Sequence, residues 1–295
     1  MQYQFRVAAF AVISFAMSVL SSCSKDNNNP VTPPVDTVGT TPKGTGVMIA
    51  NTTKFGAVLT DSLGKTLYFF ANDAAGVSTC TGGCIAAWPV FYKEVLTVDS
   101  TLVAADFGVI TRADGSKQNT YKGWPLYYYN QDTKAGDMNG DPVGNVWFVA
   151  KPDYSVMLAN FQLTGNDNVQ YTGSYTPGTG ATQFITDAYG RTLYAFSHDA
   201  NKTNVYTKAD LSNEAAWPIY QVDTIKNIPS ILDKAAFVKI TVFGRTQLTY
   251  KGWPLYYFGN DQQTRGNTKG VSVPTPGVWP IVNVASTEAP APSLP

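Results

Sequence analysis

A segment of nine residues occurs twice in the chain without a change: residues 120–128 and residues 249–257 both read TYKGWPLYY. Its end belongs to a shorter motif, Leu-Tyr-x-aromatic-x-x-Asp, which occurs four times, at residues 67–73, 126–132, 193–199 and 255–261. A repeat sets the architecture of a chain before any single residue is considered. It also provides an internal control, because a site that every unit needs should be present in every unit.

Two long units align across the chain with a small, regular drift. Asp61 matches Asp187, and two tryptophan pairs follow in the same order, Trp88 with Trp217 and Trp147 with Trp279. We therefore predict a first unit at residues 47–155 and a second at residues 178–286. The stretch between them, 156–177, is predicted to be a linker, and the proline-rich end, 287–295, a disordered tail.

Each unit divides again into two halves of similar pattern. In the first unit, residues 58–70 and 108–129 both read as an apolar strand, a turn with glycine and an aromatic strand, which is typical of a hairpin. Only residues 80–88, 208–217 and 230–237 look helical, and they are short. The predicted fold is mainly β: two tandem homologous antiparallel units, each of two hairpin-like half-repeats with one short helix.

The N-terminal residues predict export and a lipid anchor. Arg6 precedes an apolar run of 14 residues, Val7–Leu20, which is too short to span a membrane comfortably and fits a signal peptide. The following Ser21-Ser22-Cys23 completes a pattern that resembles a bacterial lipobox. This resemblance implies cleavage of residues 1–22 and a diacylglyceryl group on the Cys23 sulfur. The alternative is an ordinary signal peptide followed by an unrelated cysteine.

The residues after Cys23 predict where such an anchor would hold the protein. Residues 23–46 are rich in Asn, Pro, Thr and Gly and contain almost no large apolar residue, so we expect a flexible tether. Ser24 is not the Asp that resembles an inner-membrane retention signal. We therefore expect a lipid anchor in the outer membrane, with the protein periplasmic or surface-exposed and the membrane as its first partner.

Composition and cysteine content narrow the function classes. Lys plus Arg and Asp plus Glu are equal at 21 each, so no basic field predicts binding to nucleic acid. In an oxidising compartment Cys80 and Cys84 are expected to pair as a structural disulfide, with a redox-active pair as the alternative. His198 is the only histidine, and two sulfurs alone do not make a zinc site. We predict neither a metal nor a cofactor.

The four motif copies place aromatic residues on one face of each strand, which we interpret as core. We expect the opposite face to be packed less tightly, because Ala195 stands where another copy has Phe69. The motif aspartates are expected to accept backbone N–H groups of the following turn. These are Asp73, Asp132, Asp199 and Asp261.

The sequence also offers a candidate ligand platform. Trp124 and Trp253 each lie between Gly and Pro on a predicted turn, where a large apolar ring is expected to be exposed. Tyr121 and Tyr250 lie three residues before them. Stacking of these rings on a glycan, or on another envelope component, is the binding mode that this arrangement suggests.

Together these motifs resemble the bacterial secreted-repeat lipoproteins with the Yx(F/W/Y)xxD motif, whose function is unknown. The likeness includes the four motif copies and Cys80 to Cys84 before Ala87-Trp88-Pro89. It implies export and a tandem repeat, and it carries no catalytic residues. We therefore expect a non-catalytic binding or structural protein. The alternatives are a redox accessory that uses Cys80 and Cys84, and a carbohydrate-active enzyme with two carboxylates.

Overall fold

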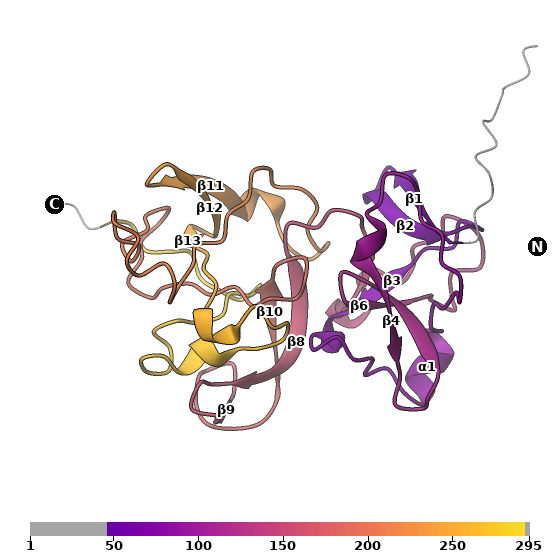
Figure 1. Cartoon of the computed structure of the whole chain (residues 1–295), viewed down its shortest axis with the longest axis horizontal. Helices are drawn as coiled ribbons and strands as arrows, with labels where there is room; N and C mark the ends of the chain where they lie inside the picture. The colour runs from indigo at the N-terminus through magenta and orange to yellow at the C-terminus, as the bar shows by residue number, and fades with distance from the viewer. Residues whose placement is uncertain (1–45, 293–295) are drawn as a thin grey trace, which may run out of the picture. The chain divides into compact units, whose positions relative to one another are not determined.

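The computed structural model describes residues 46–292 (Figure 1). In it the aromatic strand of the first motif lies between two other strands of the same sheet. The predicted signal peptide, Cys23 and the tether up to residue 45 lie outside the described residues, as do residues 293–295. In the first unit the strands form a five-stranded antiparallel sheet in the order β4-β5-β6-β3-β7, beside a separate β1-β2 hairpin. The strands are β1 (Val47–Thr52), β2 (Gly56–Asp61), β3 (Tyr68–Phe70), β4 (Phe107–Thr111), β5 (Lys117–Tyr121), β6 (Trp124–Tyr127) and β7 (Trp147–Val149).

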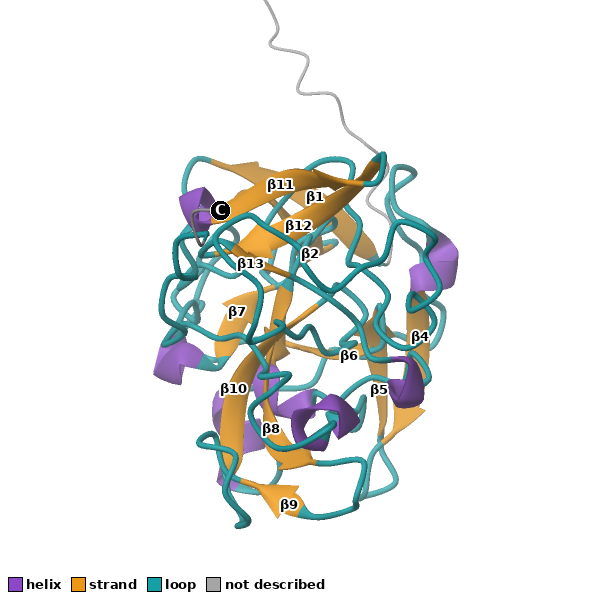
Figure 2. Cartoon of the chain, turned by 90° about the vertical axis from the view of Figure 1, so that its left-hand side faces the viewer, coloured by secondary structure: helices purple, strands orange, loops and turns teal. Residues whose placement is uncertain are grey.

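The second unit repeats the pairing of the central strand, with single bridges in place of ladders. Tyr194 forms single antiparallel bridges to Tyr256 and Ile281, as β3 pairs with β6 and β7 in the first unit. The predicted mainly β fold of two similar antiparallel units is therefore confirmed. The strands of this part are β8 (Met157–Thr164), β9 (Gln170–Tyr171), β10 (Ala181–Thr186), β11 (Phe237–Val242), β12 (Arg245–Tyr250) and β13 (Trp253–Pro254) (Figure 2).

The segment predicted as a linker, 156–177, is instead the start of the second unit. Met157 of β8 pairs with Thr186 of β10, just as Val47 of β1 pairs with Asp61 of β2. Strand β9 lies in the enlarged loop of this hairpin. The glycine- and asparagine-rich loop after β8 concealed the strand, because its composition is typical of a connection rather than of a hairpin.

Helical structure is sparse in the described chain. The helix expected within residues 80–88 is present as α1 (Gly83–Ala87). The expected counterpart at 208–217 forms turns, and Leu211 there has a φ of 59°, which an α-helix does not accommodate. Residues 230–237 contain only a short 3₁₀ helix. The 3₁₀ helices are η1 (Ala71–Asp73), η2 (Ala104–Asp106), η3 (Val143–Asn145), η4 (Lys234–Ala236), η5 (Gly259–Asp261) and η6 (Lys269–Ser272).

The two units share one hydrophobic core. Its largest cluster joins Phe69 and Trp124 of the first unit to Met157 and Tyr194 of the second. Arg265 fastens this junction: its Nε donates to the Ala74 carbonyl at 2.8 Å, and its guanidinium lies 4.6 Å from the centre of the Trp124 ring. The units therefore pack against each other as parts of one folded body.

The face opposite the motif tyrosines is fully buried in only two of its four copies, since Tyr128 and Tyr257 are half-buried, which agrees with the expectation of looser packing there. Phe69 and Ala195 are each 1% exposed. Phe69 packs against Trp124 and Phe148, at ring-centre distances of 5.3 and 5.5 Å. Phe69 and Ala195 both belong to the cluster that the two units share, so each packs against different neighbouring side chains.

The described part of the tail, 287–292, packs against the second unit, which corrects the prediction of disorder there. The Ala289 N–H donates to the Lys251 carbonyl at 2.9 Å, and the Asn201 N–H donates to the Pro290 carbonyl at 2.7 Å. Trp253 Nε1 donates to the Thr287 carbonyl at 2.9 Å. These residues therefore cover the turn that carries Trp253.

Deletion of residues 287–295 should lower the free energy of unfolding by on the order of 1–3 kcal/mol, because it removes these backbone bonds and the burial of Ala289. It should also shift tryptophan emission to longer wavelength as Trp253 gains solvent. Urea unfolding and fluorescence measure both effects. Deletion of residues 293–295 alone is the control, and equal stability of the two truncations would contradict this role of the tail.

Candidate functional site

The motif tyrosines and aspartates form reciprocal hydrogen bonds between the two halves of each unit. Tyr68 donates to Asp132 and Tyr127 donates back to Asp73, both at 2.6 Å. In the second unit Tyr194 donates to Asp261 and Tyr256 to Asp199, both at 2.7 Å. All eight side chains are buried. Each half-repeat thus completes its motif with the carboxylate of its sister half.

The second oxygen of each motif carboxylate accepts a backbone N–H group from the turn that follows. For Asp73 and Asp132 the donors are Thr79 and Asn139, at 2.7 and 2.9 Å. This confirms the expectation that these carboxylates organise turns. Because both oxygens of each carboxylate bind donors of the protein, the motif stabilises the fold.

The aromatic residue two positions after each motif tyrosine lies at one end of a stack of four rings, and each unit has one such stack. In the first unit Phe70, Trp147, Trp88 and Tyr129 follow one another, and the two tryptophan centres are 3.8 Å apart. The second unit repeats the stack, with its two tryptophan centres 3.6 Å apart. Its members are Phe196, Trp279, Trp217 and Phe258. The recurring aromatic residues are therefore core, as predicted.

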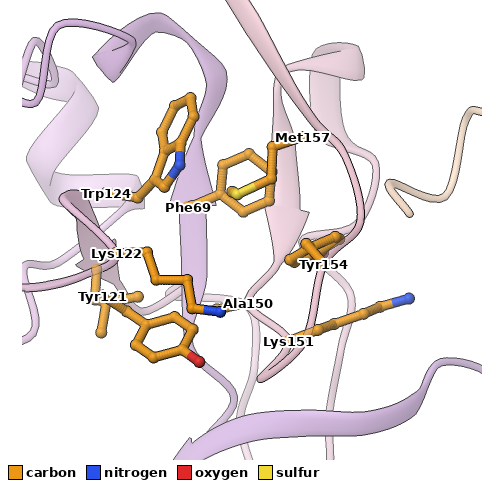
Figure 3. A pocket seen from close by; sticks show the side chains of 9 residues that line it. Phe69, Tyr121, Lys122, Trp124, Ala150, Lys151, Tyr154 and Met157 are labelled. Carbon is orange, nitrogen blue, oxygen red and sulfur yellow. The ribbon is translucent and has the colours of Figure 1, made fainter. Parts of the chain in front are cut away.

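The predicted ligand platform is not a surface. Trp124 is 1% exposed, Tyr121 is 6% and Tyr250 is 2%, while Trp253 is partly exposed beneath the tail. The predicted turns exist, but Trp124 turns inward and its Nε1 donates to the Ala188 carbonyl at 3.1 Å. Figure 3 shows Trp124 and Phe69 beside a cavity of only ≈ 10 Å³, which is too small for a ligand.

The cysteines form the expected disulfide, Cys80–Cys84, next to α1. Cys80 is buried, and its carbonyl accepts a hydrogen bond from Arg112 at 2.6 Å. His198 lies at the surface beside Phe196, away from any carboxylate partner among the hydrogen bonds of the described chain. Within residues 46–292, no group of three or more His, Cys, Asp or Glu side chains could hold a metal ion.

A groove of ≈ 560 Å³ opens in the second unit, and of its lining residues the sequence analysis selected only Asp261, as a turn-forming carboxylate. Its volume lies within the range of about 300–1,000 Å³ that is usual for ligand pockets. The lining combines apolar and aromatic side chains with amides and charged groups. The members used below are Arg191, Glu214, Pro218, Ile219, Gln221, Tyr257, Asp261, Gln262 and Gln263.

The charged groups of the groove are held by partners in the protein. Arg191 forms an ion pair with Asp187, and it also donates to the Tyr257 hydroxyl at 3.2 Å. Glu214 binds Arg245 through both carboxylate oxygens, at 2.8 and 3.0 Å. The groove walls are therefore fixed in place by ion pairs rather than mobile.

At the floor of the groove, burial raises the pKa of Asp261 to about 6, against the hydrogen bond from Tyr194 that favours the ionised form. Burial also raises the pKa of Asp199 to about 6, and that of Asp73. Desolvation outweighs the hydrogen bonds because each carboxylate is surrounded by aromatic rings. A change in the protonation of Asp261 therefore affects the stability of this unit, and Asp261 also lines the groove.

The groove residues could have been found as the positions where the two units differ while their framework agrees. Gln262 and Gln263 follow the fourth motif, whereas Thr133 and Lys134 follow the second. Gln221 stands where the first unit has Tyr92. This comparison needs the alignment of the units but no coordinates, so the signal was present in the sequence.

Three segments of the chain, residues 50–92, 108–151 and 238–283, match a family model described as a secreted repeat of unknown function. The chain belongs to this family. The matches cover both halves of the first unit and the second half of the second. No curated protein and no solved structure matches the chain. In the part that the structure describes, no helix has the length and apolar character needed to cross a membrane.

The first half of the second unit lies outside the matched segments, yet it keeps the contacts of the secreted repeat. Tyr194 and Asp199 there form the same reciprocal bonds as Tyr68 and Asp73 do in the first unit. Four half-repeats are therefore present in structure. The divergence of this half fits its place beside the groove, since Arg191 and Glu214 come from it.

Tyr194→Phe should lower the free energy of unfolding by about 1–3 kcal/mol, because it leaves one oxygen of the buried Asp261 carboxylate without its donor. Chemical denaturation measures this loss. Tyr189→Phe is the matched control, since the Tyr189 hydroxyl donates to Asp106 at the surface, and it should change stability by less than about 0.5 kcal/mol. Equal effects of the two substitutions would contradict the structural role of the buried pair.

Stability should rise as the pH falls from 7.5 to 5. The folded protein takes up protons at Asp199 and Asp261 near pH 6, whereas unfolded aspartates do so only near pH 4. Each carboxyl should therefore add on the order of 1 kcal/mol to the free energy of unfolding over this interval. Surface aspartates with a lowered pKa, such as Asp137, should reverse the trend only below about pH 4. Urea unfolding at pH 7.5 and 5.0 tests the sign, and lower stability at pH 5.0 would refute it.

Proposed function

We propose that this secreted-repeat protein is a non-catalytic, lipid-anchored envelope protein that binds a small polar molecule in the groove of its second unit. One observation carries the proposal: beside framework residues such as Asp261, the groove is lined by Gln221, Gln262 and Gln263, which the repeat framework does not use. The framework residues are the same in both units, so the repeat alone does not account for a polar groove of this size in the second.

Binding is favoured over hydrolysis by the state of the two carboxylates at the groove. Asp261 accepts Tyr194 on one oxygen and the Lys269 N–H on the other. Glu214 binds Arg245 and also accepts the Ile219 N–H at 3.2 Å. A general acid or base needs a lone pair or a proton directed at the substrate, whereas both oxygens of each of these carboxylates bind donors of the protein.

A structural role of the Cys80–Cys84 disulfide is favoured over a redox relay by its short loop and by its replacement in the second unit. It closes a loop of five residues, and the chain-entropy model gives such a short loop only ~2 kcal/mol of stabilisation. In the second unit, Asn213 stands in the place of Cys84. It accepts the Lys208 N–H at 3.1 Å and donates to the Tyr206 carbonyl at 2.6 Å. Hydrogen bonds thus replace the bridge in a unit that folds in the same way.

The lipid anchor at Cys23 is part of this proposal and rests on the lipobox-like sequence. It would hold the protein at the outer membrane through residues 23–46, on the periplasmic or the surface side. Mass spectrometry of the mature protein should find a diacylglyceryl-modified Cys23 as its first residue. An unmodified N-terminus elsewhere would reject the anchor and leave the groove unaffected.

The binding site can be tested by filling the groove. Ala215 lines it and is exposed, so Ala215→Trp should block the groove without disturbing the core. Ala86, the equivalent exposed residue of the first unit, provides the control Ala86→Trp. Native mass spectrometry of the protein incubated with the small-molecule fraction of an envelope extract measures retention.

Wild type and Ala86→Trp should both retain a component of the extract, and Ala215→Trp should lose at least about tenfold in affinity, corresponding to ~1.4 kcal/mol. Unchanged retention by Ala215→Trp would show that the groove is not the site. Melting temperatures of the three proteins confirm that each is folded.

A further inference from the structure

We infer that the ligand of this groove is a neutral carbohydrate, bound through hydroxyl groups by the glutamine side chains at its rim. The inference rests on the proposed binding function and narrows it to one chemical class. It follows from the pairing of charges in the groove, from the chemistry of its free groups and from the backbone that carries them.

The charges of the groove are balanced within the protein, which disfavours an ionic ligand. Arg191 donates to the Asp187 carboxylate, the Tyr257 hydroxyl and the Gln263 side-chain oxygen, the last at 3.1 Å. Its guanidinium also lies 4.8 Å from the centre of the Tyr257 ring. An anionic ligand would compete with the buried Asp187 carboxylate for this guanidinium, and a cationic one would compete with Arg245 for Glu214. Breaking such a pair leaves a charge without its partner.

The groups that remain free at the rim are amides. Gln221, Gln262 and Gln263 are all exposed, and within residues 46–292 the amides of Gln221 and Gln262 make no hydrogen bond to the protein. A glutamine side chain offers an acceptor oxygen and a donor NH₂ group. A sugar hydroxyl likewise donates and accepts, so each amide can serve a hydroxyl or two adjacent ones. The half-buried Pro218 and Tyr257 add apolar surface for the C–H groups of a sugar ring.

The backbone at the rim adopts an unfavourable conformation at Gln262 and Gln263. Glutamine is not the residue that this conformation favours. Gln262 has φ 53° and Gln263 has φ 55°, so two consecutive residues lie in the left-handed region that favours glycine. Such conformations cost of order 1 kcal/mol or more for each residue and concentrate at binding sites. Within the described residues, Thr133 and Lys134 of the first unit do not share this conformation. Glycine would adopt this conformation at lower cost, so the backbone does not require glutamine at either position.

Ligand-observed NMR of the full-length protein in detergent tests the inference with three sets of disaccharides: neutral ones such as maltose, cellobiose and chitobiose, anionic uronic acid dimers, and cationic glucosamine dimers. At least one neutral sugar should bind, and Ala215→Trp should remove its signal. The charged sets should bind at least tenfold more weakly. Stronger binding of a charged set would overturn the inference while leaving the groove as a binding site.

The double variant Gln262→Gly, Gln263→Gly separates ligand binding from folding. It should raise the melting temperature, because the left-handed strain that glycine relieves at two residues outweighs the loss of the exposed hydrogen bond from Arg191 to Gln263. It should also weaken neutral-sugar binding at least tenfold, because the amides are gone. The matched control Thr133→Ala, Lys134→Ala should leave binding unchanged. A glycine variant that binds as tightly as wild type would refute the role of the amides.

The same experiments distinguish failure of the inference from failure of the proposed function. If no sugar binds but an extract component is still lost in Ala215→Trp, the carbohydrate class is wrong and the binding function stands. If neither sugars nor extract components respond to Ala215→Trp, both are wrong.

Discussion

The exchange of tyrosine–aspartate hydrogen bonds is the interaction on which the rest of the fold depends. Tyr68 and Tyr127 are partners in the sheet, and each reaches the carboxylate that ends the other's motif. A buried carboxylate without donors is unstable, and so is a buried hydroxyl without an acceptor. Neither half-repeat can therefore satisfy its own motif, and the folding unit is a pair of halves. This explains why the motif appears an even number of times.

Because the motif residues are committed to folding, function has to come from the positions that are left free. The two units keep the tyrosine–aspartate exchange and the stack of four rings, yet differ where Gln221, Gln262 and Gln263 line the groove. The local supports differ in the same region. The first unit uses a disulfide and a short helix, whereas the second uses hydrogen bonds of Asn213 and the ion pair of Glu214 with Arg245. Glu214 also lines the groove, so the ion pair that replaces the disulfide lies at the surface that differs between the units.

The sequence was sufficient for those features that each strand encodes locally. Hairpins, the buried tyrosines and the turn-forming aspartates could be predicted, since alternation and turn residues report on them directly. It failed where a distant segment decides the outcome. Trp124 looked exposed on its turn, but Arg265 and the Ala188 carbonyl cover it from the second unit. Strand β8 was hidden by the long loop between it and β10. The glutamines of the groove lie where the two units differ, so a search for similarities between the units did not select them.

The turn that carries the repeated tryptophan shows how one local sequence can serve two contexts. In the first unit the second unit covers it, and there a Cβ on Gly123 would lie 2.0 Å from the Arg265 guanidinium. In the second unit the tail covers the same turn, and a Cβ on Gly252 would lie 2.5 Å from the Asn201 side-chain oxygen and 3.2 Å from the Ala289 side chain. Glycine is therefore required in both turns by different neighbours. Since a tandem repeat exposes its last unit unless something caps it, the tail takes the place that a following unit would fill.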